Sequence, residues 1–353
     1  MLKVNFWLRK LLKEWLFLFS TIGAIITSIY LKRIPHYSVS DFNVLFIIFS
    51  FLVVLKGLQN SKALYFVAAK IGLGRFVGLK LIFLTLILAM FLTNDISLLL
   101  VVPITILMDV ENKDMLVILE AIAANASSAL LPSGNPQNMF IYWFYSLNLF
   151  EFVKAIYPFC LVSVVLLVIF ALLFKFEGKS LNLSFSVEPN YKLYLILLVL
   201  MIAVILKFVP IWTGLIVVFY AVLFDRDALK IDYFLLGIFF MFFGFTDNLA
   251  HILRFSFTKG DSVFVFSALF SQLISNVPSA LFFADFTNNW KALLWGVSVG
   301  GYGNLIGSLA NLIAYRIYVS HVEESKKFLW KFMVIGYFFF FSLFLFRILY
   351  NYN

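Results

Sequence analysis

Residues 79–109, LKLIFLTLILAMFLTNDISLLLVVPITILMD, form an apolar segment with a polar triplet, Thr-Asn-Asp at 93–95, in its middle and Pro103 beyond it. As a helix, the limb 78–92 would be about 20 Å long, short of the roughly 30 Å hydrocarbon core of a bilayer. Broken backbone at such a depth is tolerated where it lines a cavity instead of facing lipid. The segment therefore predicts a re-entrant helical hairpin, whose two short helices enter and leave on the same side.

A second segment has the same pattern. Residues 262–285, SVFVFSALFSQLISNVPSALFFAD, are apolar except for the central pair Ser275-Asn276, which Pro278 follows. Each limb is again too short to cross a bilayer. We therefore expect a second re-entrant hairpin.

Two further apolar segments, 115–147 and 290–319, are interrupted by small and polar residues. The first contains NASSALLPSGNPQN at 125–138, and the second contains GGYGNLIGSLAN at 300–311. Proline and glycine would be costly in a continuous lipid-facing helix. Both segments are predicted to unwind near the middle of the membrane; close packing of small residues is the alternative for the Gly and Ser positions.

The composition fits this interpretation. Of 353 residues, 63% are hydrophobic and 13% are charged, against roughly 45–50% and 25% in soluble domains. So much apolar surface excludes a soluble enzyme, a nucleic-acid-binding protein and a secreted module, and it predicts an all-α polytopic membrane protein in a lipid bilayer. Nine spans are expected, counting the two broken ones: 14–31, 41–58, 115–147, 150–174, 191–208, 210–225, 232–249, 290–319 and 328–350.

Characteristic residues recur in the same order in the two halves of the chain. Gly23 and Asp41 match Gly214 and Asp232 at an offset of 191, Asn94 matches Asn276 at 182, and Gly134 and Asn138 match Gly307 and Asn311 at 173. Such self-similarity predicts an internal repeat. We assign residues 1–174 to a first repeat with the hairpin 79–109, 175–190 to a polar linker, and 191–353 to a second repeat with one extra span and the hairpin 262–285.

The distribution of basic residues predicts the orientation of the chain. When the nine spans are threaded, 19 of the 27 Lys and Arg residues fall on the side of the N-terminus and 8 on the other. The positive-inside rule makes the first side cytoplasmic. A multi-pass inner-membrane protein is expected, with its N-terminus and linker in the cytoplasm and its C-terminus outside. The two repeats then run in opposite directions, as inverted repeats.

Inverted repeats with broken helices are typical of secondary transporters, which bind substrate and coupling ion at the repeat interface. Half-helix N-termini attract anions, and half-helix C-termini provide carbonyls for cations. The spans contain no HExxH or GxSxG motif, and nothing resembles a P-loop, so we expect no enzyme and no cofactor beyond Na⁺ or H⁺ as coupling ion.

Five motifs in the chain resemble those of the ion transporter superfamily. They are FLTND (91–95), ANASS (124–128), GNPQN (134–138), SQLISNVP (271–278) and GGYGNLIGS (300–308). The chain is most similar to the arsenite-permease and citrate-transporter-like branch, which includes sodium/proton antiporters. The resemblance covers about residues 14–350 and implies a carrier of a small inorganic or carboxylate anion.

The same resemblance implies which residues contact the substrate and the coupling ion. These are Thr93, Asn94, Asp95, Asn125, Ser128, Gly134, Asn135, Asn138, Ser275, Asn276, Gly301, Asn304, Gly307, Ser308 and Asn311. Na⁺ is expected near Asn94, Asp95, Asn135, Asn276 and Asn304. Dicarboxylate carriers of the superfamily have Ser-Asn-Thr at both tips, whereas this chain has Thr-Asn-Asp and Ser-Asn-Val.

The sequence leaves two functions open: an anion or oxyanion carrier driven by Na⁺ or H⁺, and a Na⁺/H⁺ antiporter of the same fold. Asp95 is the main candidate for ion coupling, because a carboxylate at membrane depth is costly and usually functional; helix capping is its structural alternative. Glu120 is expected to snorkel or to pair with a lysine, and Asp247 to lie near the outer interface. The sequence is compatible with a homodimer and with a separate ATPase subunit.

Overall fold

The structure is a computed structural model that describes residues 14–71, 76–176, 178–179, 187–253, 257, 259–322 and 325–350. The basic N-terminus and much of the linker fall outside the described residues. Within them the chain forms sixteen α-helices, three short 3₁₀-helices and one two-residue strand pair. Four helices, α3, α9, α12 and α17, are long and apolar enough to cross a bilayer. The chain is a polytopic membrane protein, as the composition predicts.

The helices of the first half are α2 (Trp15–Leu31), α3 (Val39–Asn60), α4 (Ala63–Ile71), α5 (Val77–Leu92), α6 (Asn94–Leu107), α7 (Lys113–Ser128), η1 (Pro132–Gly134), α8 (Pro136–Phe144) and α9 (Leu149–Leu173). Those of the second half are α10 (Tyr191–Ile205), η2 (Ile211–Gly214), α11 (Leu215–Phe224), η3 (Arg226–Leu229), α12 (Tyr233–Leu253), α13 (Gly260–Ile274), α14 (Asn276–Ala284), α15 (Trp290–Gly300), α16 (Leu309–Val319) and α17 (Ser325–Leu349). Strand β1 (Asp109–Val110) pairs antiparallel with β2 (Gly178–Lys179).

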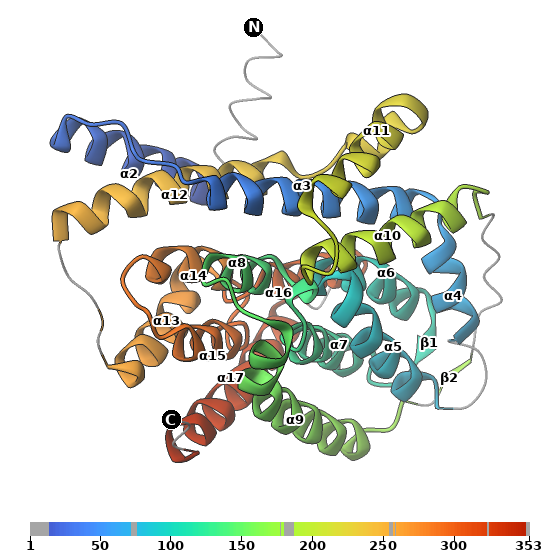
Figure 1. Cartoon of the computed structure of the whole chain (residues 1–353). Coiled ribbons are helices and arrows are strands. Elements are labelled where there is room, and N and C mark those ends of the chain that lie inside the picture. Colours follow the sequence, from blue (N-terminus) through green and yellow to red (C-terminus); the bar gives the residue numbers. More distant parts are fainter. Residues whose placement is uncertain are drawn as a thin grey trace, which may run out of the picture.

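The helices are arranged in two layers (Figure 1). One layer contains α2, α3, α10, α11 and α12, with α2 packed against α12 and α3 against α10. The other contains the helix pairs α5–α6 and α13–α14 and the broken segments α7–α8 and α15–α16. The layers meet where α3 packs on α8 and α12 packs on α14. Helices α9 and α17 lie on the far side of the second layer (Figure 1).

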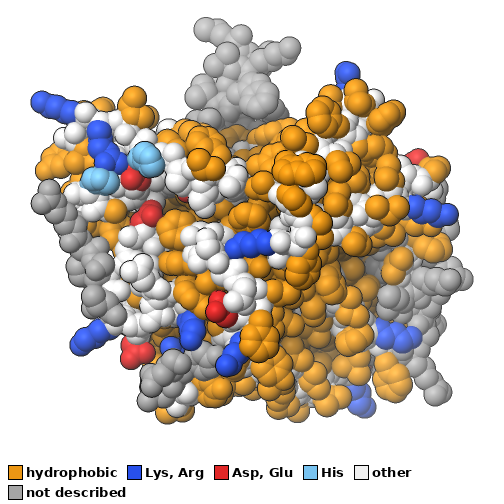
Figure 2. Space-filling view, in the orientation of Figure 1, with side chains coloured by type: hydrophobic (Ala, Val, Ile, Leu, Met, Phe, Trp, Pro, Cys, Tyr) orange, Lys and Arg blue, Asp and Glu red, His pale blue; other side chains and the backbone are white. Residues whose placement is uncertain are grey.

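The outer surface is strongly apolar. Figure 2 shows broad areas of hydrophobic side chains on one face of the molecule. Ile29, Phe219 and Leu349 leave 71%, 63% and 81% of their surface exposed. Contiguous apolar surface of this extent is stable only against another apolar phase, here the lipid.

Ion pairs join the ends of helices from different parts of the chain. Arg33, after α2, pairs with Asp247 of α12, whose Oδ2 also accepts a hydrogen bond from the His36 backbone N–H at 2.9 Å. Asp114, at the start of α7, pairs with Lys331 of α17. Asp247 thus lies in a polar cluster with Arg33 and His36 in the second half of α12, and its position near the outer interface stays a prediction.

Glu120 is buried in α7, contrary to the expectation that it would snorkel or pair with a lysine. Its Oε1 accepts a hydrogen bond from Thr105 Oγ1 at 2.5 Å, and no lysine pairs with it within the described residues. Glu120 lies about 7 Å inside the predicted span, counted from Met115, and α5 and α6 both pack against α7. A side chain so enclosed cannot reach the interface.

Candidate transport site

The two helix pairs turn at residues with the same unusual backbone. Thr93, between α5 and α6, has φ 82° and ψ 149°, and Ser275, between α13 and α14, has φ 79° and ψ 157°. Positive φ is uncommon for residues other than glycine and costs on the order of 1–3 kcal/mol, so such residues concentrate at functional sites. These are the two positions that the sequence predicts as hairpin tips.

The break between α7 and α8 is closed by one asparagine side chain. Asn138 Nδ2 donates to the carbonyl oxygens of Ser128, Ala129 and Leu131, at 3.1, 2.9 and 3.2 Å. Asn135 caps α8 by accepting from the Asn138 N–H at 2.9 Å. The carbonyls that the end of α7 leaves unpaired therefore find their donors within the break itself.

The break between α15 and α16 has the same design. Asn311 Nδ2 donates to the carbonyl oxygens of Gly301 and Asn304, at 2.9 and 3.1 Å. Gly301, Asn304 and Asn311 follow Ser128, Leu131 and Asn138 by the same 173 residues. Equivalent contacts at equivalent positions show that each break is organised by a matching asparagine.

A glutamine that is absent from the predicted site residues braces the second break. Gln272 Nε2 donates to the carbonyl oxygens of Gly300 and Tyr302, at 2.7 and 3.0 Å, and its Oε1 accepts from the Asn304 N–H at 3.1 Å. Asn304 in turn donates to the Gln272 carbonyl at 2.9 Å. The helix pair α13–α14 and the unwound segment are thereby tied together.

The tips and the breaks converge on one buried group of polar side chains. Asn94 Nδ2 lies 3.2 Å from Asn125 Oδ1 and 3.4 Å from Ser308 Oγ, and Asn125 Nδ2 donates to Asn311 Oδ1 at 2.8 Å. Asn276 joins them through its backbone N–H, which donates to the Gly307 carbonyl at 3.0 Å. We call Asn94, Asn125, Asn276, Ser308 and Asn311 the amide cluster; all five are at most 6% exposed.

Other predicted site residues lie around the amide cluster. A Cβ atom added to Gly301 would lie 3.2 Å from Asn276 Nδ2 and 3.5 Å from Asn125 Oδ1, so the glycine leaves room beside both amides. Asn135 Nδ2 donates to Ser128 Oγ at 3.3 Å, inside the first break. The Asn138 side chain bonds within its own break, whereas the Asn304 side chain donates to the Gln272 carbonyl in α13. Asn304 meets the amide cluster through its carbonyl oxygen, which accepts from Asn311 Nδ2.

A cavity of about 370 Å³ adjoins the tips. Such a volume suits a small-molecule ligand. Its lining combines both tips, the start of α8, the second break, α16 and the first residues of α2 and α12 from the other layer. The lining residues are Glu14, Trp15, Leu16, Asp95, Pro136, Asp232, Leu235, Ile238, Ser275, Val277, Pro278, Leu305, Ile306, Ser308, Leu309, Leu312 and Arg316. Asp95 lines this cavity, and its Oδ1 is buried without a hydrogen-bond partner.

Asp95 is not the cap of α6. Thr93 holds that position, with its Oγ1 accepting from the Ile96 N–H at 3.4 Å, and Asp95 lies in the first turn of the helix. The capping alternative for Asp95 is therefore wrong. No group of three or more His, Cys, Asp or Glu side chains within the described part of the chain is arranged to hold a metal ion.

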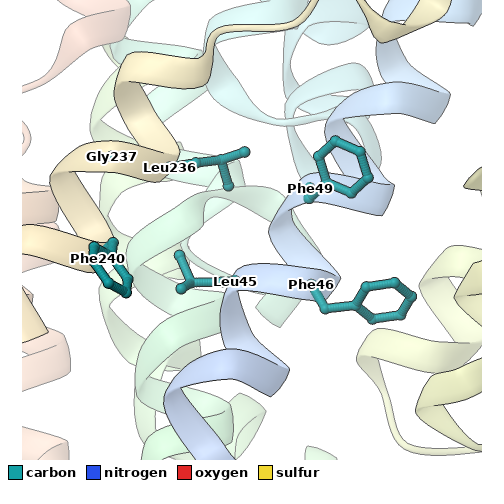
Figure 3. A pocket seen from close by; sticks show the side chains of 6 residues that line it. All are labelled: Leu45, Phe46, Phe49, Leu236, Gly237 and Phe240. Atoms are coloured by element: carbon teal, nitrogen blue, oxygen red, sulfur yellow. The ribbon is translucent and has the colours of Figure 1, made fainter. Parts of the chain in front are cut away.

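A separate hollow between α3 and α12 is entirely apolar (Figure 3). It offers a polar solute no hydrogen-bond partner, and we exclude it as a transport site. Its side chains are Leu45, Phe46 and Phe49 of α3 and Leu236, Gly237 and Phe240 of α12.

Comparison with known proteins places the chain in a family. A model of the citrate transporter family matches residues 11–300. The chain belongs to the citrate transporter family. It is 29% identical over 311 residues to an uncharacterized transporter of Methanocaldococcus jannaschii, covering 85% of this chain and 86% of the relative. It is 32% identical over 270 residues to the inner membrane protein YbiR of Escherichia coli strain K12, covering 70% and 69%.

Membership of the citrate transporter family confirms the resemblance drawn from the motifs, and it makes the chain a membrane transporter and not an enzyme. The matched range includes both tips, the first break and the start of the second. The matched range ends at residue 300, so the family match does not include the unwound residues 301–308.

The asparagines that close the breaks provide a first prediction. Asn138→Ala removes three hydrogen bonds from buried carbonyls and should lower the free energy of unfolding by about 2–4 kcal/mol. Asn311→Ala should have a comparable effect. Thermal unfolding in detergent measures both. Asn43→Ala in α3 is the control, because the Asn43 side chain makes no hydrogen bond within the described residues. Equal melting temperatures for Asn138→Ala and Asn43→Ala would contradict the bracing role.

Proposed function

We propose that this member of the citrate transporter family is a secondary active carrier of a small anion, with citrate as the first candidate and H⁺ or Na⁺ as the coupling ion. The observation that carries the proposal is the convergence of two tips and two breaks on the amide cluster, beside a cavity that contains Asp95. Helices α6, α8, α14 and α16 all begin at this place. The positive ends of their helix dipoles favour an anion.

We also propose that the two halves are inverted repeats, 1–174 and 191–353, joined by the linker 175–190, and that the second has one extra span. The helix pairs α5–α6 and α13–α14 are then the re-entrant hairpins. The matching backbone at Thr93 and Ser275 and the matching contacts of Asn138 and Asn311 support this assignment. Opposite entry would give each side of the membrane its own gate.

The proposed orientation has the N-terminus in the cytoplasm of the cell, the C-terminus outside, and the chain in the inner membrane. Its support is that contacts join helix ends that the threading puts on one side: Arg33 with Asp247 outside, and Asp114 with Lys331 inside. Glu14, Asp232 and Arg316, which line the cavity, all belong to the cytoplasmic side of this threading. The cavity is then inward-open, and movement of one helix layer against the other, elevator-like or rocking, would expose it to the outside.

The coupling ion would bind near Asp95, with Asn94, Asn135, Asn276 and Asn304 as the neighbouring oxygen donors. A buried carboxylate oxygen without a partner is costly unless a proton or cation neutralises it. The same observation favours the second candidate, a Na⁺/H⁺ antiporter in which Asp95 is the shared ligand of both ions.

Uptake into proteoliposomes distinguishes the two functions. Radiolabelled citrate is offered under imposed Na⁺, pH and voltage gradients, with arsenite and phosphate as competing probes. Accumulation of citrate against its gradient, dependent on one of the cation gradients, supports the carrier. Exchange of Na⁺ for H⁺ that needs no anion supports the antiporter. The absence of both in folded protein contradicts both proposals.

The orientation has its own test, because Cys160 is the only cysteine in the chain and is 5% exposed. A membrane-impermeant maleimide should not label the parent protein. It should label Ile34→Cys from the outside only and Asp227→Cys from the cytoplasmic side only; Ile34 is 87% exposed, and Asp227 lies in η3 with its side chain 70% exposed. Leu312→Cys should be labelled from the cytoplasmic side through the cavity. The reverse pattern would overturn the orientation.

A further inference from the structure

Arg316 is an exposed basic residue on the wall of the cavity. It lies in the last turn of α16, lines the cavity, and its side chain makes no ion pair or hydrogen bond within the described part of the chain. By contrast, Arg33, Lys230 and Lys331 each pair with an aspartate. A guanidinium exposed to a cavity keeps all its donors available for a ligand.

The helix places Arg316 on the same wall as the amide cluster. Ser308, Leu312 and Arg316 are spaced by four residues and line the cavity together, so one face of α16 runs along it. Eight residues separate Ser308 from Arg316, which corresponds to about 12 Å along the helix axis. An anion attracted by the guanidinium would thus already be in the compartment that leads to the tips.

Among the described residues that line the cavity, Arg316 is the one basic residue, so it supplies the positive charge that an entering anion meets there. Three carboxylates line the same space: Asp95 at the first tip, Asp232 before α12 and Glu14 before α2. Asp232 is engaged in part, because its Oδ1 accepts from the Phe234 N–H at 3.0 Å. Without Arg316, every ionisable side chain that the described residues contribute to the lining would be acidic, which disfavours the entry of an anion.

We propose that Arg316 is the anion-docking residue of the cavity: its guanidinium binds an oxyanion group of the substrate and so selects anions over cations at the entrance. The proposal rests on the carrier function proposed above. A planar guanidinium suits this role because it pairs with a carboxylate through two parallel hydrogen bonds, which a lysine cannot reproduce.

The test compares three variants for uptake of radiolabelled citrate into proteoliposomes under the cation gradient that drives the parent protein. Arg316→Gln should raise KM about 10- to 100-fold, the value of a lost charge-assisted hydrogen-bond pair, with the maximal rate changed less than threefold. Arg316→Lys should give an intermediate KM, since the charge stays and the fork is lost. Arg226→Gln removes an exposed arginine that does not line the cavity and bonds only the Val222 carbonyl within the described residues, so its KM should match the parent.

The outcomes separate a docking role of Arg316 from a structural one. A KM in Arg316→Gln within twofold of the parent overturns the inference while the carrier function stands. A fall in maximal rate with unchanged KM, not rescued by Arg316→Lys, indicates a structural role and also overturns it. Absence of uptake of any anion by the folded parent protein defeats the proposed function, and this inference with it.

Discussion

Asp95→Asn should abolish cation-driven accumulation of citrate while leaving the protein folded. The substitution keeps the shape of the side chain and removes its charge, and with it the ability to bind and release a proton or to neutralise Na⁺. Asp95 is the single carboxylate at either tip, lines the cavity and has a buried oxygen without a partner. We expect at least a 100-fold loss of driven uptake, in line with the loss of an essential charged ligand.

The stability cost of Asp95→Asn should be small. Thr93 caps α6, so Asp95 contributes only the attraction between a negative charge and the first turn of a helix, about 0.3–1 kcal/mol. Asp232→Asn is the matched control, because it changes a second carboxylate of the same cavity in the same way. Its Oδ1 caps α12, and an asparagine oxygen can accept the same hydrogen bond from Phe234. Driven uptake by Asp232→Asn should therefore stay within a few-fold of the parent.

Two assays on Asp95→Asn distinguish the candidate functions. A carrier that has lost its coupling group should still exchange internal citrate for external citrate. An antiporter should lose Na⁺/H⁺ exchange whether or not an anion is present. Cation-driven uptake by Asp95→Asn at the rate of the parent protein would show that Asp95 does not take part in ion coupling.

Much of the architecture follows from local sequence. Glycine, proline and asparagine at 125–138 and 300–311 predict helices that unwind, and the structure ends α7 at Ser128 and α15 at Gly300. The polar tips at 93–95 and 275–276 separate α5 from α6 and α13 from α14. These features are local because a helix must stop wherever its backbone bonds cannot continue.

The partners of the site residues are long-range and harder to predict. The repeat offset of 173 pairs Asn138 with Asn311 in sequence, yet it does not say that each would donate to the carbonyls of its own break. Gln272 belongs to the SQLISNVP motif, but its role depends on contact with residues 300–304. In the sequence analysis, Arg316 contributes only to the count of basic residues on the predicted cytoplasmic side. The helical spacing of Leu309, Leu312 and Arg316 is the signal in the sequence, because it puts the three residues on one face of a helix. That this face lines a cavity becomes clear only from the structure, where the first residues of α2 and α12 line the same space.

Gly134→Ala should have the largest effect on folding. A Cβ atom there would lie 2.1 Å from the Ser128 carbonyl oxygen and 2.7 Å from the Ser128 Cα and carbonyl carbon. All three are backbone atoms at the end of α7, and Asn138 fixes the same carbonyl. Neither Gly134 nor the end of α7 can move away without breaking the hydrogen bonds that close the first break. Clashes of this kind belong to the severe class of substitutions, so we expect a loss of more than about 4 kcal/mol and little monodisperse protein after solubilisation.

The second break should respond in the same way, since a Cβ atom on Gly307 would lie 2.6 Å from the Gly300 carbonyl oxygen and 2.8 Å from that of Tyr302. Gly301→Ala is the informative contrast. Its nearest neighbours would be Asn276 Nδ2 at 3.2 Å and the Ser298 carbonyl oxygen at 3.3 Å, contacts that a shift of a few tenths of an ångström would relieve. This variant should fold and yet transport poorly, because the added methyl occupies space beside two of the amides. Yield and melting temperature report the first effect and uptake the second. A Gly134→Ala protein as stable as Gly301→Ala would mean that the first break is not the rigid element that its contacts describe.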